Sequence, residues 1–221
     1  MLTNPVYAAL TGQHATFAEI RGNARCYPKA IAPFLGLPDD PTDQDWADAA
    51  ELLGVGTTVA LMRPDLPVPA TFKLDRQFDL VQFAAPPTLA GSDDEAVVLG
   101  PDDVPEMLGL VALTDPGPFR SRTIELGTYL GIRRDGDLIA MAGTRFALPE
   151  HTEISAVCTH PSYRGEGLAT RLIRAVAAQI ESTGGHPFLH TGGTNTQAIR
   201  LYKSLDFTLT NRMKVTIVEP V

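Results

Sequence analysis

A short turn between an expected strand and an expected helix carries the clearest chemistry in this sequence of 221 residues. It runs from Tyr163 to Ala169 and contains two glycines, Gly165 and Gly167. The first amides of a helix have no intrahelical partner and lie at the positive end of the helix dipole. Glycines let the backbone approach an anion closely, and Arg164 adds a charged donor. The turn therefore predicts a site for a phosphate or pyrophosphate.

The two glycines alone do not decide between a binding site and a tight connection without a ligand. The turn lacks the third glycine and the downstream acid of a dinucleotide-binding motif. It also lacks the Gly-Lys-Ser/Thr ending of a P-loop. Neither of these two nucleotide-binding motifs is therefore expected here.

A resemblance to a known family covers about residues 96–221. The segment 157–169 is similar to the acetyl-CoA motif of the GNAT superfamily of N-acetyltransferases. The family pattern Arg/Gln-x-x-Gly-x-Gly/Ala falls on Arg164, Gly167 and Ala169. This resemblance implies that the expected anion is the pyrophosphate of acetyl-CoA.

A second segment, residues 195–207, resembles the family pattern Asn-x-x-Ala-x-x-Leu-Tyr-x-x-x-Gly-Phe. Asn195 and Tyr202 occupy the expected places, whereas Asp206 stands where the family has glycine. This departure concerns the turn after the helix and does not touch the cofactor contacts. Two motifs in the family's order support the resemblance together.

The resemblance also implies how acetyl-CoA is held. In this family, the strand before the motif separates from its neighbour, and the pantetheine arm lies between them. Backbone groups of Val157 and Thr159 are then expected to pair with this arm, and amides of residues 165–170 to hold the pyrophosphate. The expected cofactor contacts are Val157, Cys158, Thr159, Arg164, Gly165, Glu166, Gly167, Leu168, Ala169, Thr170, Asn195 and Tyr202.

Two residues are expected to be catalytic by the same resemblance. Tyr202 matches the family tyrosine that protonates the departing thiolate, and its alternative is a core aromatic. Amines have pKa values of about 8 to 10.4, so a base assists their attack. Glu153 is the candidate base, with a solvated strand glutamate as the alternative. Strand alternation is expected to place Glu153, Ser155, Val157 and Thr159 on one face.

Other reactive side chains receive structural interpretations. Cys158 is expected to be a buried small side chain rather than a nucleophile. His160 and His190 are expected to be satisfied histidines at a loop and a strand end. Asn195 is expected to cap a helix, to contact CoA, or both. The five histidines show no metal-ligand spacing, so no metal is expected.

The second part of the chain predicts an α/β fold with a mixed central β-sheet flanked by helices. Hydrophobic periodicity predicts three helices and six strands in this part. The predicted strands are 96–99, 129–133, 138–146, 152–159, 188–191 and 213–218. The predicted helices are 102–113, 167–181 and 195–204. Asp135 and Gly136 predict a tight hairpin turn.

A Pro- and Gly-containing stretch, residues 84–95, predicts a boundary near residue 92. Residues 1–92 are expected to form a smaller N-terminal α+β domain of unknown role. A partial degenerate GNAT-like unit and an unrelated acceptor-binding domain are both open for it. Residues 93–221 are expected to be the catalytic GNAT domain. The predicted N-terminal elements are a helix at 43–53 capped by Asp43, and strands at 14–20, 57–62 and 77–83. The N-terminal domain is expected to form one wall of the acceptor pocket. Residues 114–119 are expected to form either a rigid turn or an acceptor-binding loop, by resemblance to the family.

Composition limits the partners. A net charge of −8 argues against nucleic acid or an anionic membrane as the main partner. The two distant cysteines predict no disulfide framework, and no apolar run is long enough for a membrane span. We therefore expect a cytoplasmic protein with a small-molecule or peptide partner, and the sequence also allows a homodimer.

These observations together predict an enzyme that transfers the acetyl group of acetyl-CoA directly to a primary amine. The acceptor is expected to be a small molecule, an amino acid or a peptide. One alternative is a non-catalytic acyl-CoA-binding regulatory module, and another is a protein-lysine or N-terminal acetyltransferase. The length of the acyl chain stays open at this point.

Overall fold

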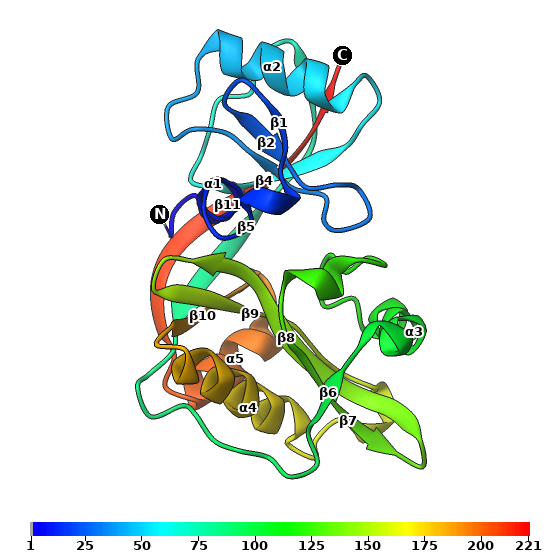
Figure 1. The fold of residues 1–221 in the computed structure, drawn as a ribbon. Helices are drawn as coiled ribbons and strands as arrows, with labels where there is room; N and C mark the ends of the chain where they lie inside the picture. The colour runs from blue at the N-terminus through cyan, green and yellow to red at the C-terminus, as the bar shows by residue number, and fades with distance from the viewer. Residues whose placement is uncertain (1) are drawn as a thin grey trace.

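The computed structural model describes residues 2–221, with one large sheet, helices on both of its faces, and a small sheet near the N-terminus (Figure 1). The strands are β1 (Glu19–Arg21), β2 (Ala24–Cys26), β3 (Leu35–Gly36), β4 (Val59–Arg63), β5 (Phe72–Ala84), β6 (Val97–Leu99), β7 (Tyr129–Arg134), β8 (Asp137–Leu148), β9 (His151–Thr159), β10 (His186–Gly192) and β11 (Thr208–Pro220). The α-helices are α1 (Pro5–Thr11), α2 (Asp43–Leu53), α3 (Val104–Thr114), α4 (Leu168–Ser182) and α5 (Thr196–Ser204).

The large sheet has the strand order β4-β11-β5-β10-β9-β8-β7-β6. Its neighbouring strands are antiparallel except for β9 and β10, which run parallel. A parallel pair needs a long crossover, and α4 supplies it between β9 and β10. The predicted α/β class with a mixed sheet is confirmed, and the N-terminal part also contains a smaller sheet of β1, β2 and β3.

Long strands cross the expected boundary near residue 92. β5 precedes that boundary, yet it pairs with β10 on one side and β11 on the other. β5 and β11 are 13 residues long each and extend through both parts of the molecule (Figure 1). An independent N-terminal domain stays a prediction, but its boundary divides one continuous sheet.

Local sequence signals explain two of the predicted elements. α2 has the predicted bounds, but its N-cap is Thr42 rather than Asp43. Thr42 and Asp45 form a reciprocal capping box, an arrangement that stabilises a helix by about 1 kcal/mol. The β7–β8 turn contains Asp135 and Gly136, both with positive φ, as its two-residue hairpin requires.

The region 14–20 differs from the predicted strand. Residues Ala15–Phe17 form a 3-10 turn, and the strand β1 begins only at Glu19. The segment before it contains α1, which no prediction anticipated. α1 packs its buried side chains, Val6, Ala9 and Leu10, against side chains of β8 and β10.

Helices cover the two faces of the sheet around β9. The buried face of α4, including Leu172 and Val176, packs on the face that carries Ile154. Met107 and Leu110 of α3 pack in another cluster, with Met141 and Cys158. The end of β9 is thus held between α4 and α3. No helix among residues 2–221 has the length and apolar character needed to cross a membrane.

Candidate functional site

The site is organised by the separation of two parallel strands. β9 and β10 pair from His151/His186 to Ile154/Leu189 and no further. Beyond this point, residues 155–159 of β9 pair with β8 on their other side. The edge of β9 that faces β10 therefore offers unpaired backbone N–H and C=O groups. A chain-like ligand with amide groups can hydrogen-bond to such an edge.

A β-bulge lies where the strands separate. Ala156 has a φ of 52°, and the register of β9 against β8 shifts between Ser155 and Cys158. The extra residue breaks the alternation of side chains. Ile154 and Val157 consequently contact the same cluster beneath α4. The expectation that Glu153, Ser155, Val157 and Thr159 share one face is therefore wrong.

Residues 160–167 connect β9 to α4 as the glycine-containing turn. Gly165 and Gly167 have φ values of 92° and 75°, in the left-handed region that favours glycine. A side chain at either position would meet no atom within 4 Å, so the space beside the turn is open. Gly167 is the N-cap of α4 and provides no side chain to the first amides of the helix. These amides are available to an anion.

The remaining turn residues divide between solvent and core. Arg164, Gly165, Glu166 and Gly167 are exposed, whereas Leu168 is buried beneath them. Ala169 and Thr170 are half-buried on the first turn of α4. Leu168 thus anchors the helix start on the sheet while the backbone before it faces outward.

Three other expected contacts lie at the ends of neighbouring elements. Thr159 ends β9, and its Oγ1 is buried without a hydrogen-bond partner among the described residues. Cys158 is buried under α3, and burial raises the pKa of its thiol to about 11, which favours the protonated, unreactive form. Asn195 is the N-cap of α5, and its Oδ1 accepts a hydrogen bond of 3.0 Å from the amide of Ala198.

Tyr202 on α5 combines a buried ring with a hydroxyl that makes no hydrogen bond to the described residues. Its ring lies 5.9 Å from that of Phe83 and 5.7 Å from that of Phe207. Its hydroxyl has no hydrogen bond to any described residue and is not among their fully buried unpaired atoms. Burial, reinforced by the charge of Glu153, raises the pKa of Tyr202 to about 12. The phenol therefore holds its proton at neutral pH and can donate it.

Asp206 preserves the turn at which the family pattern has glycine. Its φ is 60°, a left-handed conformation that aspartate adopts more readily than most residues. Phe207 follows and returns to the core beside Tyr202. The departure from the family pattern therefore leaves the position of Tyr202 intact.

Glu153 is not a solvated strand residue. It is 1% exposed, and its carboxylate accepts two hydrogen bonds of 2.7 Å from the guanidinium of Arg145. It also accepts a 2.7 Å bond from Nδ1 of His190. Burial raises the pKa of Glu153, but Arg145 and His190 outweigh this effect and lower it to about 2. The carboxylate is therefore ionised, and both of its oxygens accept hydrogen bonds from protein side chains.

The network continues across the sheet through Gln82 on β5. Because ionised Glu153 can only accept, His190 Nδ1 donates to it, and His190 Nε2 accepts from Gln82 at 2.9 Å. The Gln82 oxygen in turn accepts from Asn211 on β11 at 2.6 Å. Side chains of five adjacent strands are linked in this way. The link between Glu153 and His190 lies beside the point where β9 and β10 separate.

Comparisons with known proteins decide the family. The family model described as FR47-like protein matches residues 129–215. A crystal structure from Novosphingobium aromaticivorans DSM 12444, described as a GNAT-family acetyltransferase, is 38% identical, with 100% of this chain and 98% of that chain covered and a TM-score of 0.91. The chain belongs to the GNAT family of acetyltransferases.

Fold similarity extends to more distant GNAT structures. A GCN5-related N-acetyltransferase from Kribbella flavida is 15% identical, covers 98% of this chain and 96% of its own, and has a TM-score of 0.65. This match supports the fold alone. No curated protein matches the chain. The N-terminal part of this GNAT protein is included in both structural matches, so it belongs to the shared architecture.

The GNAT structure separates the expected site residues into two groups. The turn residues, Thr159 and the unpaired edge of β9 are continuous along the chain between β9 and α4. Tyr202 is in the same apolar cluster as Val157 and Leu168. Glu153 lies apart from this cluster, bound to Arg145 and His190. The sequence did not lead us to predict a role for Arg145 or Gln82. For Arg145, its charge within the otherwise apolar run of β8 was a signal.

Proposed function

We propose that this protein transfers the acetyl group of acetyl-CoA directly to a primary amine. The observation that carries the proposal is the separation of β9 from β10 immediately before a glycine turn that opens α4. The unpaired backbone edge suits the amides of a pantetheine arm, and the uncapped helix start suits a pyrophosphate. Both features fit acetyl-CoA, and family membership makes it the expected donor.

The proposed binding residues follow the chain from β9 into α4. Backbone groups of Val157 and Thr159 would hold the arm, with Cys158 between them. The amides of residues 165–170 would hold the pyrophosphate, with Arg164 beside them and Asn195 and Tyr202 approaching from the α5 side. Bound acetyl-CoA supplies an activated acyl group as a thioester. The protein's part is to bind and orient it and to supply a proton.

Tyr202 is the proposed acid. Its hydroxyl makes no hydrogen bond to a described residue, while its ring packs against Phe83 and Phe207. A phenol with a pKa of about 12 stays protonated throughout the range in which an amine is neutral. The Tyr202 hydroxyl can therefore give a proton to the thiolate that leaves.

Glu153 is proposed to position the site rather than to act as the base. A base must reach the acceptor and take its proton, but Glu153 is 1% exposed, and both of its oxygens already accept hydrogen bonds from Arg145 or His190. With a pKa near 2, the carboxylate is also a weak base. Its contacts hold β8, β9 and β10 together at the separation point.

Replacing Tyr202 by phenylalanine separates catalysis from binding. The ring contacts are kept, so the melting temperature and the Kd of acetyl-CoA should change little. Loss of the proton donor should lower kcat by about 100-fold, within the usual range for general acids. Steady-state kinetics and calorimetry measure the two effects. Unchanged kcat would remove Tyr202 from the mechanism.

A turnover screen tests the function itself. Release of CoA thiol is followed with amino acids, polyamines, aminoglycosides and peptides as acceptors, and with acetyl-CoA or longer acyl-CoA donors. We expect catalytic turnover with at least one small amine. Binding of acetyl-CoA without turnover on any amine would favour a non-catalytic binding module. Turnover confined to protein substrates would favour a protein acetyltransferase.

A further inference from the structure

The segment that joins β5 to β6, residues 85–96, runs along α4 before it enters the sheet (Figure 1). Its composition is that of a linker, yet it is bound to the helix at more than one point. Leu89 is 3% exposed and belongs to the apolar cluster beneath α4. The amide of Gly91 donates a hydrogen bond of 3.2 Å to the carbonyl of Arg174 on α4. We call residues 85–96 the strap.

The strap also binds Arg171, on the first turn of α4. Arg171 donates from Nε to Asp93 Oδ2 at 2.5 Å and from Nη2 to Asp93 Oδ1 at 2.7 Å. Its Nη2 also donates to Glu95 Oε2 at 2.5 Å. The Asp93 side chain is 9% exposed and that of Arg171 33%, so the pair is partly shielded from water. A bidentate pair of this kind fixes the orientation of both groups as well as their separation.

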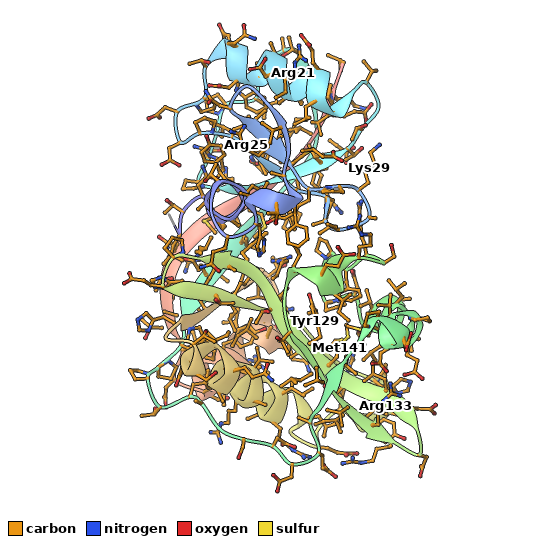
Figure 2. All side chains as sticks on the ribbon, in the orientation of Figure 1. Arg21, Arg25, Lys29, Tyr129, Arg133 and Met141 are labelled. Atoms are coloured by element: carbon orange, nitrogen blue, oxygen red, sulfur yellow. The ribbon has the colours of Figure 1, made fainter. Side chains whose placement is uncertain are left out.

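The other end of the strap is bound to the sheet. Glu95 accepts a hydrogen bond of 3.0 Å from Nη2 of Arg134, the last residue of β7. Figure 2 shows the neighbouring Arg133 at the end of β7 that points away from the N-terminal part. The strap then continues into β6, which pairs with β7. Through Glu95, the strap therefore links the edge of the sheet to Arg171.

The Asp93–Arg171 pair lies one helical turn from the glycine turn. The amide of Arg171 donates to the carbonyl of Gly167, the N-cap of α4, at 3.1 Å. Gly167 has no side chain with which to fix the helix start, and glycine backbones are conformationally free. The first amides of the helix can hold an anion only while they stay in place. The Asp93–Arg171 pair supplies an anchor for this turn from a distant part of the chain.

Arg171 is bound in a way that favours an anchoring role over contact with a phosphate. Two carboxylates accept its Nε and Nη2 hydrogen bonds, so its charge is already neutralised by the protein. The hydrogen bonds from Arg171 also lower the pKa of Asp93, which keeps this carboxylate ionised at neutral pH. The exposed cation at the glycine turn itself is Arg164.

We propose that Asp93 and Arg171 are positioning residues for the acetyl-CoA site. Through this pair, the strap holds the start of α4 in the arrangement that binds the pyrophosphate, and neither side chain touches the cofactor. The linker between the two parts of the chain thus determines cofactor affinity. This inference rests on the proposed function, because it concerns the cofactor site of that reaction.

Asp93→Asn tests the inference, since it keeps the size of the side chain and removes its charge. Calorimetry on the full chain should show a Kd for CoA raised about tenfold, as when the binding arrangement is populated a tenth of the time. With an amine that gives thiol release, the KM for acetyl-CoA should rise by the same factor while kcat is unchanged. Arg171→Met should raise the Kd equally. Thermal unfolding of each variant measures any general loss of stability.

Glu106→Gln is the matched control. Glu106 binds Arg133 at 2.6 Å, and its side chain is 48% exposed, the same fraction as that of Glu95. This ion pair joins the end of β7 to α3, whereas the strap joins it to α4. The Kd of CoA should therefore be unchanged in Glu106→Gln.

An unchanged Kd in Asp93→Asn would overturn the inference. It would do so even if Arg171→Met weakened binding, because Arg171 would then act on the cofactor directly. A lowered Kd in Asp93→Asn, an equal rise in Glu106→Gln, or undetectable CoA binding by the unchanged protein would also overturn it. The absence of thiol release with every amine contradicts the proposed function instead. That result would leave a measured difference in CoA affinity intact.

Discussion

Replacing Gly167 by valine is expected to raise the Kd of acetyl-CoA by about 100-fold or more, the loss of about two charged hydrogen bonds. Gly167 has a φ of 75°, and a β-branched residue at this conformation is strained. The backbone would leave the left-handed region, and the first amides of α4 would turn away from the pyrophosphate. The added side chain would also occupy the open space beside the turn.

The same helix offers a matched control. Gly184, just after α4, has a φ of 78°, and a side chain there would likewise meet no atom within 4 Å. Gly184→Val should therefore impose a similar conformational cost, about 1 to 2 kcal/mol, without touching the cofactor site. Calorimetry with CoA and thermal unfolding of both variants separate affinity from stability. Equal loss of CoA affinity in both variants would contradict the proposed cradle.

The glycine turn could be predicted because its determinants are local. Positive φ values at Gly165 and Gly167 follow from residue type and from the change of periodicity between β9 and α4. The same holds for the hairpin at Asp135 and for α2. Each of these features depends on a few neighbouring residues, and each was found where the sequence placed it.

Features that depend on distant pairing could not be predicted in this way. The bulge at Ala156 is a feature of the pairing between β9 and β8, and no residue type in β9 indicates that a bulge occurs there. Because of this bulge, the prediction placed Val157 on the wrong face of the strand. The pairing of β5 with β10 and β11 likewise joins segments more than 100 residues apart in the sequence. The loop after β5 has the composition of a domain boundary, but the sheet is continuous across it.

The environment of Glu153 was missed for the same reason. Arg145 is eight residues away in sequence, but it reaches Glu153 only through the irregular β8–β9 register. His190 comes from the far side of the α4 crossover. A carboxylate near the start of the motif strand suggested a base, and only its partners reveal that it forms a buried ion pair with Arg145.

Replacing Glu153 by glutamine is expected to lower the free energy of unfolding by about 3 to 5 kcal/mol, because it leaves the buried charge of Arg145 without a counterion. Denaturant unfolding measures this loss. Glu125→Gln is the matched control, since Glu125 also binds an arginine through two hydrogen bonds but at an exposed site. Little change is expected there. The double variant Arg145→Leu/Glu153→Leu should recover stability relative to Glu153→Gln.

The pH dependence of stability follows from the lowered pKa of Glu153. Its value is 4.5 in the unfolded reference and about 2 in the folded protein. The stabilisation is therefore complete above pH 4.5 and is lost as the pH falls towards 2. Glu153→Gln should lose this part of the acid dependence while keeping that of the other carboxylates. An identical acid-unfolding profile in both proteins would contradict the ionised pair.

The pH profile of catalysis separates positioning from base catalysis. A general base loses activity as it is protonated, so its pKa appears on the acid side of the kcat/KM profile. A Glu153 pKa of about 2 lies below any assay range, so Glu153→Gln should leave the shape of the profile unchanged between pH 5 and 9. Its effect should appear instead as a raised KM for acetyl-CoA, because Glu153 and His190 hold β9 and β10 where the strands separate. Loss of the acid-side decline in Glu153→Gln would restore Glu153 as the base.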